Sequence, residues 1–420
     1  MKEIKTQKIA DCRIRVPGSK SYTHRMIIAA ALADGMSTLK NALISEDTQF
    51  TIEALGQMGV RIQANNEGVI VHGKGGLLEA CDTPIYLGNS GTSMRLITGI
   101  AALGKGTYTL TGTVRMQERP IKDLLDALHQ MGVSARSLKG DGCPPVEITG
   151  TTISKDQVDI NCQVSSQYLS ALLLLAPGTP KGLQIRVNGG PVSRPYVDLT
   201  VALMKAFGIQ LEREGYRKFK VPGSQVYRAG NYSVEADCSQ AAYFWGAAAI
   251  TGAHIKVMDV NANSAQGDLR FVDLLEQMGC KVFRDSDGIG VAGGRLHAIE
   301  ADLADMPDQV PTLAVVAAFS EGTTLIRNVA HLKSKESDRL TATVTELKKM
   351  GIEAVCTHSA LIVRGGNPRG SVINTYNDHR MAMSFAIAGL NVPGVFIRNE
   401  DCVVKSFPAF WQVFEELYPS

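Results

Sequence analysis

The pattern of apolar and polar positions along the chain repeats itself. An amphipathic stretch that ends in Gly and runs into a strand-like alternation recurs as EALGQMGVRI, DALHQMGVSA, VALMKAFGIQL, LLEQMGCKV and ELKKMGIEA. A glycine after the last apolar turn is a common stop signal for a helix. The pattern therefore predicts outer helices, each followed by a hairpin. Their glycines recur every 71 to 76 residues, at Gly59, Gly132, Gly208, Gly279 and Gly351.

A second phrase lies half a period away and consists of a polar start, a run of small and apolar residues, a turn and a strand. Helices without a polar face are typical of a protein core. The sequence thus predicts six copies of one α/β unit, each with a buried helix, an outer helix and strands, and FWQVFEEL as the last outer helix. The buried helices are expected to begin near Ser21, Gly91, Ser165, Cys238, Asp308 and Asp378.

Six units in 420 residues suggest two domains of three units each, with a ligand cleft between them. We expect the chain to cross between the domains at the Pro17–Gly18 turn and again near Gly230, and the N-terminal strand to pair with the last unit. The first domain would then span residues 15–230, and the second residues 1–14 together with 231–420.

The composition excludes several classes of function but does not identify one. A net charge of +2 argues against a general nucleic-acid binder. The start of the chain lacks an apolar signal core, and runs such as YLSALLLLA are too short to span a bilayer. The eight cysteines include no C-x-x-C pair, which argues against a zinc or redox motif. We expect a cytoplasmic protein of enzyme size with reduced thiols and no metal site.

The polar helix starts carry more chemistry than a helix cap needs. PGSKSYTHR is similar to a phosphate-binding loop, but Ser19 stands where a P-loop requires Gly before the lysine. A helix N-terminus with Lys20, Ser21 and Arg25 nevertheless favours an anion. Taken alone, the stretch fits a capped surface helix equally well. The six starts considered together favour convergence on one anion-attracting cleft over scattered surface salt bridges.

Two carboxylates stand among these cations. Asp308 opens the fifth helix start, and Glu336 lies in the stretch KSKESDR. Carboxylates beside lysine or arginine can serve as base and acid, although each one taken alone could be a helix cap or an ion-pair partner. No H-E-x-x-H and no clustered Cys and His indicate a metal site.

The motifs PGSKSYTHR, LGNSGTSMR, RMQERPI, SSQYLSALL, PVSRPYVDLT, PDQVPTLAV, KESDRL, NDHRMAM and KSFPAF resemble, in this order, those of the 5-enolpyruvylshikimate-3-phosphate synthase family of enolpyruvyl transferases (3-phosphoshikimate 1-carboxyvinyltransferase, EC 2.5.1.19). The match runs from about residue 15 to about residue 410. The resemblance implies two domains, each of three βαβαββ units with buried parallel helices. It implies that the enolpyruvyl group of phosphoenolpyruvate is added to the 5-hydroxyl of shikimate 3-phosphate and that phosphate is then eliminated, in the shikimate pathway, without a cofactor.

The resemblance also implies residue roles. Asp308 would take the proton of the attacking hydroxyl, and Glu336 and Lys20 would serve proton transfer at the methylene carbon. The first domain would mainly bind shikimate 3-phosphate, and the second would complete the phosphoenolpyruvate site; we expect a monomer with no nucleic-acid or membrane partner. Shikimate 3-phosphate would be bound by Ser21, Arg25, Ser165, Ser166, Gln167, Ser193, Tyr196, Asp308 and Lys335. Phosphoenolpyruvate would be bound by Lys20, Gly91, Arg119, Gln167, Arg339, Arg380 and Lys405.

Two alternatives remain open at this point. UDP-N-acetylglucosamine enolpyruvyl transferase shares the fold and the phosphoenolpyruvate chemistry, but it usually has asparagine after the first lysine and a catalytic cysteine in a loop. Here Ser21 follows Lys20, and RMQERPI contains no cysteine. A non-catalytic binder of phosphorylated metabolites would not need Asp308 and Glu336 together with Lys20.

Overall fold

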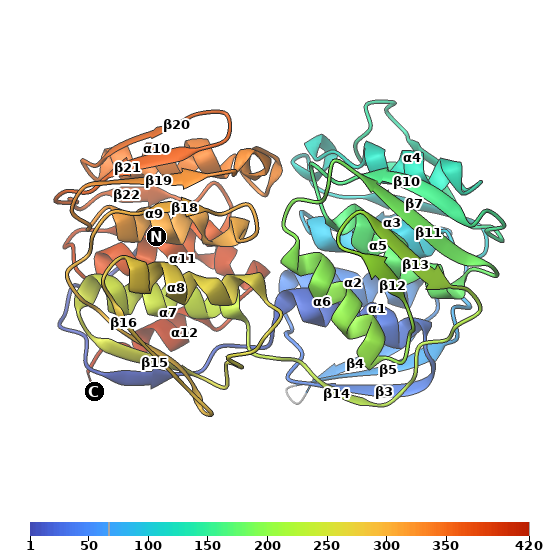
Figure 1. The fold of residues 1–420 in the computed structure, drawn as a ribbon, viewed down its shortest axis with the longest axis horizontal. Helices are drawn as coiled ribbons and strands as arrows, with labels where there is room; N and C mark the ends of the chain where they lie inside the picture. Colours follow the sequence, from blue (N-terminus) through green and yellow to red (C-terminus); the bar gives the residue numbers. More distant parts are fainter. Residues whose placement is uncertain (66–67, 420) are drawn as a thin grey trace. The chain divides into compact units, whose positions relative to one another are not determined.

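The computed structural model describes residues 1–65 and 68–419. The chain divides into two compact units. We call Gly18–Val234 the middle unit, and Met1–Pro17 together with Glu235–Ser420 the split unit. In Figure 1 the middle unit runs from blue to green, and the split unit runs from yellow to red and includes the blue N-terminal strands. No helix in residues 1–65 and 68–419 is long and apolar enough to cross a bilayer.

Within the described residues the strands form six small mixed sheets, five of four strands and one of three. Each four-stranded sheet has the same plan. One edge strand is parallel to its neighbour, and the other two pairs of neighbouring strands are antiparallel. Helices alternate with the strands along the chain. The predicted α/β class is therefore confirmed.

The middle unit contains three of the four-stranded sheets. In spatial order, the first has β14 (Asn231–Ser233), β3 (Asp34–Lys40), β5 (Gly68–Lys74) and β4 (Arg61–Asn65), with α1 (Lys20–Leu32) and α2 (Glu46–Gln57). The second has β6 (Ile85–Tyr86), β7 (Thr107–Thr111), β9 (Val146–Thr149) and β8 (Ser134–Ser137), with α3 (Gly91–Ala101), η1 (Met116–Glu118) and α4 (Lys122–Gln130). The third has β10 (Gln157–Asn161), β11 (Gly182–Asn188), β13 (Lys218–Pro222) and β12 (Glu212–Glu214), with α5 (Gln167–Leu175), η2 (Ala176–Gly178) and α6 (Pro195–Ala206).

The split unit contains the other three sheets. The first has β16 (Lys281–Asp285), β17 (Gly288–Ala292), β15 (His254–Met258) and β2 (Cys12–Ile14), with α7 (Cys238–Thr251), η3 (Gly267–Arg270) and α8 (Phe271–Gln277). The second has β18 (Glu300–Asp302), β19 (Thr323–Arg327), β21 (Leu361–Arg364) and β20 (Glu353–Cys356), with η4 (Pro307–Gln309), α9 (Val310–Ala317), η5 (Ala330–Ser334) and α10 (Arg339–Lys349). The three-stranded sheet has β1 (Lys2–Glu3), β23 (Phe396–Arg398) and β22 (Val372–Asn374), with α11 (His379–Gly389), η6 (Glu400–Lys405) and α12 (Phe410–Glu415).

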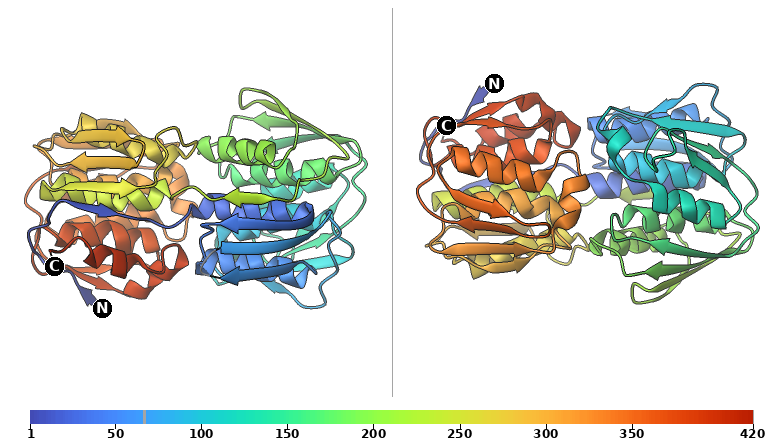
Figure 2. Two further views of the ribbon diagram at one scale, coloured as in Figure 1. Left: turned by 90° about the horizontal axis from the view of Figure 1, so that it is seen from below. Right: turned by 90° about the horizontal axis from the view of Figure 1, so that it is seen from above.

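Two sheets take their parallel edge strand from a distant part of the chain. β14 lies beside β3, and β2 lies beside β15, as Figure 2 shows. The chain changes unit between Pro17 and Gly18 and again between Val234 and Glu235. Close to these points the amide of Asp237 donates to the carbonyl of Pro17 at 2.9 Å. β1 pairs with β23, so the N-terminal strand joins the last copy, as the pattern predicts.

The outer helices end where the glycine pattern places their ends. α2, α4, α6, α8 and α10 each stop two residues before the predicted glycine. A positive φ favours glycine because a Cβ would be strained in that conformation. The φ angles lie between 78° and 110° at all five positions: Gly59, Gly132, Gly208, Gly279 and Gly351.

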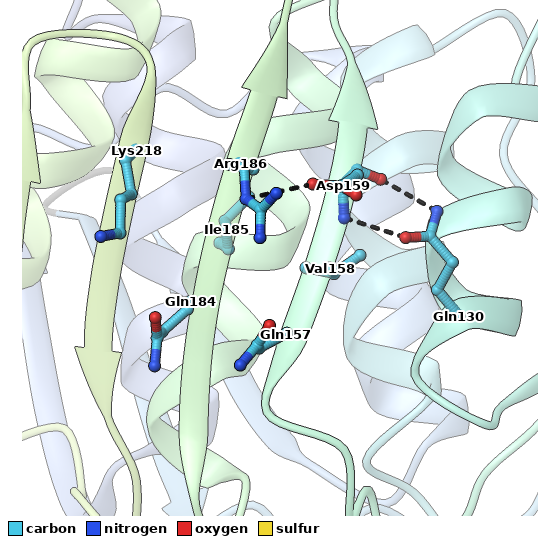
Figure 3. A pocket seen from close by; sticks show the side chains of 8 residues that line it. All are labelled: Gln130, Gln157, Val158, Asp159, Gln184, Ile185, Arg186 and Lys218. Carbon is cyan, nitrogen blue, oxygen red and sulfur yellow. Dashed lines mark hydrogen bonds and ion pairs between the residues drawn. The ribbon is translucent and has the colours of Figure 1, made fainter.

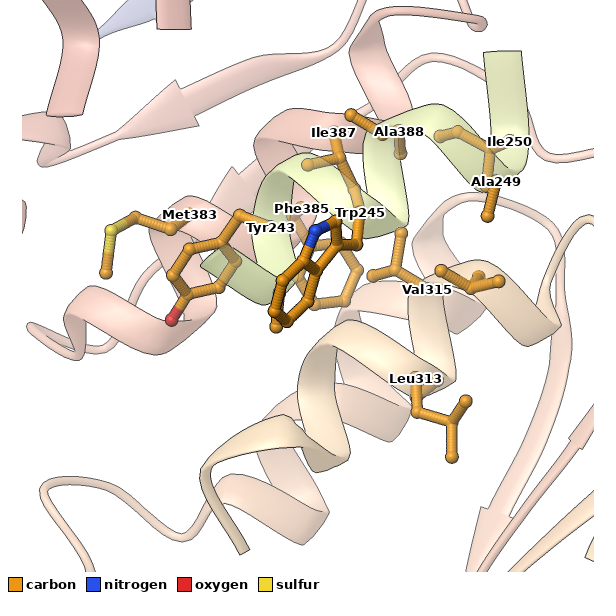
Figure 4. Packing of buried hydrophobic residues seen from close by; sticks show 14 of the residues in the cluster. Tyr243, Trp245, Ala249, Ile250, Leu313, Val315, Met383, Phe385, Ile387 and Ala388 are labelled. Atoms are coloured by element: carbon orange, nitrogen blue, oxygen red, sulfur yellow. The ribbon is translucent and has the colours of Figure 1, made fainter. Parts of the chain in front are cut away.

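The buried helices pack on one another through small and apolar side chains. In the split unit, α7, α9 and α11 contribute Trp245, Val315 and Phe385 to one core (Figure 4). The buried Trp245 indole N–H donates to the carbonyl of Ile289 at 3.0 Å. Helices that are buried on all sides can present polar chemistry only at their ends. The six buried helices begin within two residues of the predicted starts, so those ends carry most of the predicted site residues.

Candidate active site

The first lysine of the middle unit is held by a carboxylate. Lys20 is the first residue of α1, and its Nζ donates to Asp47 Oδ2 at 2.9 Å. Asp47 lies in the first turn of α2 and is only 2% exposed. The acidic side chain is therefore fixed next to the helix start that also carries Ser21. Sequence reasoning missed Asp47; its place in the first turn of α2 reads as ordinary dipole compensation.

Arg25 crosses the core of the middle unit and ties three helices together. Its Nε donates to Thr200 Oγ1 of α6 at 2.8 Å, and its Nη2 donates to Ser170 Oγ of α5 at 3.3 Å. The third bond runs from Nη1 to the carbonyl of Ser21 at 3.0 Å. Burial lowers the pKa of Arg25 to about 10. These partners orient the guanidinium without cancelling its charge, so an anion placed beside it would be stabilised.

The N-terminus of α3 brings two further arginines together around Gly91. A Cβ at Gly91 would lie 2.5 Å from Arg119 Nη2 and 2.7 Å from Arg95 Nη1. Arg119 Nη1 donates to the carbonyl of Asn89 at 2.9 Å and to its Oδ1 at 3.1 Å. The absence of a side chain at Gly91 thus leaves room for the two guanidinium groups beside the helix start, where they and its free N–H groups could bind one anion.

Gln167 links the starts of α3 and α5. Its Oε1 accepts from Arg95 Nη1 at 2.9 Å, and its Nε2 donates to Thr92 Oγ1 at 2.8 Å. The backbone N–H of Gln167 donates to Ser165 Oγ at 3.3 Å. Ser166 is the buried N-cap of α5. The side chains of these helix starts therefore form one connected polar region.

The remaining predicted residues of the middle unit lie at the start of α6. Ser193 is buried and has a positive φ of 53°, two residues before the helix begins. Tyr196 is in the first turn, and its carbonyl accepts from Thr200 Oγ1 at 2.7 Å. Because Thr200 also accepts from Arg25, the hydrogen bonds connect α6 to the start of α1. All predicted residues of the middle unit thus lie at the N-terminal ends of α1, α3, α5 and α6, except Arg119, which follows η1.

In the split unit the arginines are tied by carboxylates. Arg339 Nη1 donates to Asp308 Oδ1 at 2.8 Å, and Nη2 donates to Glu336 Oε2 at 2.7 Å. Its Nε donates to Asp378 Oδ2 at 2.8 Å. Arg380 Nη2 donates to the other oxygen of Asp308 at 2.9 Å. The structure therefore brings the two predicted carboxylates, Asp308 and Glu336, onto the same guanidinium.

The carboxylates determine the protonation of these arginines. Burial alone would lower the pKa of Arg339, but Asp378, Glu336 and Asp308 outweigh it and raise that pKa. Burial likewise opposes the charge of Arg380, and Asp308 raises the pKa well above its ordinary value. Both side chains are therefore cations, and Asp308 lies between two of them.

Arg380 also has a neutral partner that the sequence pattern did not reveal. Its Nη1 donates to the hydroxyl of Tyr243 at 2.9 Å. Tyr243 belongs to α7 and is buried, and burial raises the pKa of its hydroxyl. The sequence does contain a signal for this contact. A tyrosine within the small and apolar run AAYFWGAAA predicts a buried hydroxyl, and a buried hydroxyl usually needs a hydrogen-bond partner.

Two predicted lysines lie at the ends of short helices in the split unit. Lys405 is the last residue of η6 and is buried, and Lys335 directly follows η5. Burial, with Lys335 as the next cause, lowers the pKa of His331 to about 3. A neutral His331 therefore accompanies the lysine. The candidate residues as a whole form two groups, one within each unit.

A hollow of about 470 Å³ lies on the outer face of the β10–β11–β13–β12 sheet (Figure 3). Its polar groups already have partners within the hollow: the backbone N–H of Asp159 donates to Gln130 Oε1 at 2.9 Å, and Arg186 Nε lies 3.6 Å from Asp159 Oδ1. The residues that line it include none of the predicted site residues. The candidate site therefore lies at the helix starts and not in this hollow.

Known proteins share both the fold and the motifs. The enolpyruvyl transferase NikO from Streptomyces tendae has the same fold, with a TM-score of 0.80 over 99% of this chain and 96% of that chain at 20% identity. EPSP synthase from Acinetobacter baumannii has a TM-score of 0.83 at 31% identity, over 99% of this chain and 97% of that chain. The class that the fold defines is thus the enolpyruvyl transferases.

The sequence comparisons specify the family within this class. The sequence profile of EPSP synthase (3-phosphoshikimate 1-carboxyvinyltransferase) matches residues 4–414. The 3-phosphoshikimate 1-carboxyvinyltransferase of Syntrophobacter fumaroxidans is 42% identical over 96% of both chains, and that of Methanosphaerula palustris is 43% identical over 96% of this chain and 95% of its own. The chain belongs to the EPSP synthase family, which confirms the resemblance carried by the motifs.

Proposed function

We propose a division of labour between the two groups of residues in a single reaction. The activity follows from the family: the chain is a 3-phosphoshikimate 1-carboxyvinyltransferase (EC 2.5.1.19) of the shikimate pathway, which uses phosphoenolpyruvate and shikimate 3-phosphate. The enolpyruvyl group is transferred to the 5-hydroxyl of shikimate 3-phosphate by addition and elimination, and phosphate is released. The observation that supports the assignment of roles is the placement of Asp308 between Arg339 and Arg380, at 2.8 and 2.9 Å.

The middle unit binds shikimate 3-phosphate. Support comes from the buried Arg25, whose bonds to Thr200, Ser170 and the Ser21 carbonyl leave its positive charge available to an anion. Hydroxyls at helix starts suit phosphate and sugar-like hydroxyl groups, because the helix dipole adds to their hydrogen bonds. The binding set that we propose is Ser21, Arg25, Ser165, Ser166, Gln167, Ser193 and Tyr196, with Asp308 and Lys335 from the split unit.

Phosphoenolpyruvate carries a phosphate and a carboxylate, so its recognition needs several cations. In the middle unit Arg119 lies beside the open helix start at Gly91, and Lys20 lies at the start of α1. Gln167 would contact both substrates. The binding set that we propose is Lys20, Gly91, Arg119 and Gln167, with Arg339, Arg380 and Lys405 from the split unit.

Substrate binding would prepare Asp308 to act as the base. Both oxygens of Asp308 accept hydrogen bonds from arginines, one from Arg339 and one from Arg380, and hydrogen bonds to a carboxylate generally make it a weaker base. When the anionic groups of phosphoenolpyruvate compete for Arg339 and Arg380, Asp308 becomes more basic. It then takes the proton of the attacking hydroxyl as the new C–O bond forms at C2.

The remaining steps move a proton at C3 and release phosphate. C3 of phosphoenolpyruvate gains a proton from Glu336 or Lys20 as C2 is attacked. The same pair then removes a proton from C3, the double bond re-forms, and phosphate leaves from C2. The buried arginines stabilise the charge that develops at both stages, and such preorganised stabilisation is generally the largest contribution to the rate.

The finer architecture is part of the same proposal. Each unit would be one domain of three βαβαββ copies, in which the middle unit mainly binds shikimate 3-phosphate and the split unit completes the phosphoenolpyruvate site. The two groups would act on the same pair of substrates, because neither group contains all of the proposed roles. The chain would act as a monomer, which sedimentation at assay concentrations tests directly.

A phosphate-release assay with two acceptors tests the function. We expect release from phosphoenolpyruvate only when shikimate 3-phosphate is present. Release only with UDP-N-acetylglucosamine would support the sister transferase instead, and binding of shikimate 3-phosphate without release from either acceptor would support a non-catalytic binder. Asp308→Asn is the matched control, because it removes one negative charge with almost no change of shape.

A further inference from the structure

Asp268 is a fully enclosed carboxylate next to the proposed base, and the mechanism above does not use it. It lies in η3 and is 4% exposed. Its Oδ1 accepts from Gln309 Nε2 at 2.9 Å, and its Oδ2 lies 3.5 Å from the Ser239 hydroxyl. Buried carboxylates are costly unless a specific arrangement retains them, so Asp268 calls for a functional explanation.

Gln309 connects Asp268 to the turn that carries the base. Gln309 directly follows Asp308 in η4, and its side chain is completely buried. The backbone N–H of Gln309 also donates to the carbonyl of Met306 at 3.1 Å, and this bond closes the turn. The bond from Gln309 to Asp268 therefore fixes the orientation of the residue next to Asp308.

The segment that carries Asp268 is itself anchored. Gln266 Oε1 accepts from the amide of Cys238 at 3.2 Å, and Gln266 Nε2 donates to the carbonyl of Ala236 at 2.8 Å. Both partners lie at the start of α7. Asp268 consequently has a fixed position between the start of α7 and the turn of Asp308, and only a substitution or a change of charge would alter its effect.

The groups that face Asp268 come from three further elements. Asp308 of η4 and Asp237 at the N-cap of α7 are like charges, and Arg380 of α11 is the opposing cation. Burial, with the charge of Asp308 as the next cause, raises the pKa of Asp268 to about 6, against the hydrogen bond from Gln309, which lowers it. The charge of Asp268 therefore changes in the pH range in which enzymes are assayed.

We propose that Asp268 is a positioning residue for the transfer reaction, which orients the turn of Asp308 through Gln309 and increases the basicity of Asp308 by its own negative charge. The inference rests on the proposed role of Asp308 as the base. Like-charge interaction is mutual: if Asp308 opposes the ionisation of Asp268, an ionised Asp268 increases the proton affinity of Asp308 to the same extent. Turnover should therefore rise as Asp268 loses its proton.

The test is the pH dependence of kcat and of both KM values between pH 5 and 9. In the unsubstituted chain we expect kcat to rise with an apparent pKa near 6. Asp268→Asn keeps an acceptor for Gln309 but removes the negative charge, so the rise of kcat near pH 6 should vanish. At pH 7.5 the kcat of this variant should be roughly three- to tenfold lower than that of the unsubstituted chain, with both KM values nearly unchanged. Glu235→Gln is the charge-matched control, since Glu235 bonds Ser264 and Gln266 in the same segment.

A second variant keeps the inference testable if Asp268→Asn does not fold. Gln309→Met removes the hydrogen bond that lowers the pKa of Asp268, so the step in kcat should move to higher pH. The inference is overturned if the unsubstituted chain shows no step near pH 6. It is also overturned if a folded Asp268→Asn retains the kcat and pH profile of the unsubstituted chain. Normal turnover by Asp308→Asn would instead overturn the proposed base.

Discussion

The arginines of the two units are equally buried but have different partners. Arg25 of the middle unit and Arg339 and Arg380 of the split unit are each only 1% exposed. Arg25 is held by hydroxyls and a carbonyl, whereas Arg339 is held by Asp308, Glu336 and Asp378. The same side chain is thus oriented by neutral dipoles in one unit and neutralised by carboxylates in the other.

This difference matches what each unit is proposed to do. The positive charge of a buried cation with neutral partners is not balanced by a negative charge, so an anionic substrate beside it is stabilised. A cation that is already paired holds its carboxylates in place, and fixed carboxylates can serve as acid or base in proton transfer. The contrast matches a middle unit that prepares the binding of shikimate 3-phosphate and a split unit that holds the proposed base, Asp308.

The largest expected effect tests the proton chemistry of the split unit. Asp308→Asn should lower kcat by roughly 10²- to 10⁴-fold, because the hydroxyl proton loses its acceptor. The affinity for shikimate 3-phosphate, measured by calorimetry, should change little, since its anion-binding side chains lie mainly in the middle unit. Near-normal turnover would remove Asp308 from the mechanism and with it the functional meaning of the comparison.

The next effect separates the two kinds of arginine by stability. Arg339→Met leaves Asp378 completely buried without its main cation, and we expect a loss of about 3–5 kcal/mol in the free energy of unfolding. Arg25→Met should stay within about 1 kcal/mol, because Ser170 and Thr200 remain hydrogen-bonded to each other at 2.9 Å.

Urea denaturation at pH 7.5 measures both free energies, and calorimetry adds the affinity of Arg25→Met for shikimate 3-phosphate, which should fall at least tenfold. Equal destabilisation by the two variants would show that neutral and charged partners make no difference here, and the comparison between the units would fail.

The repeat made much of the fold predictable from the sequence. Helix stops such as Gly59 and Gly351 depend on local backbone geometry, and the buried helix starts depend on a local change in composition. The sequence could not show which distant strand completes the first sheet of each unit. The pairing of β14 with β3, and of β2 with β15, depends on long-range packing that three-residue strands do not specify.

The cationic residues of the candidate site were predictable from the sequence, because motifs concentrate them. The partners that orient these cations were less predictable. Lys20, Arg339 and Arg380 stand in charged phrases, but Asp47 and Tyr243 lie in ordinary helical sequence. Their contacts arise only when helices from different parts of the chain pack together. Asp268 was missed for the same reason, because nothing within GDLR distinguishes a buried carboxylate from an exposed one.

A smaller effect tests how open the anion-binding side must be. In Gly91→Ala the new Cβ would have to displace the Arg119 and Arg95 guanidinium groups, since it would lie 2.5 and 2.7 Å from them. These are flexible side-chain ends, so we expect a folded enzyme with a KM for phosphoenolpyruvate raised roughly tenfold. The KM for shikimate 3-phosphate should change much less.

Steady-state kinetics with each substrate varied in turn measures both constants. Gly56→Ala is the matched control, because a Cβ at Gly56 in α2 would meet nothing within 4 Å. Unchanged kinetics of Gly91→Ala would indicate that Arg119 does not bind phosphoenolpyruvate in the position that it has here.

The smallest expected effect is a pH dependence of stability within the split unit. His331 has a folded pKa of about 3 against 6.5 when unfolded, so the unfolded chain takes up this proton first and stability falls as the pH drops from 6.5 towards 3. Asp268 acts in the opposite sense: its folded pKa of about 6 exceeds the unfolded 3.8, so acidification between these values favours the folded chain. On lowering the pH from 7.5 to 5, His331→Asn should therefore lose up to about 2 kcal/mol less than the unsubstituted chain, and Asp268→Asn should lose more. Urea midpoints at both pH values measure the differences. If His331→Asn and the unsubstituted chain lose equal stability, the carboxylates of the split unit stabilise a protonated His331 as they stabilise Arg339, and the distinction between the paired arginines and the neutral histidine would not hold.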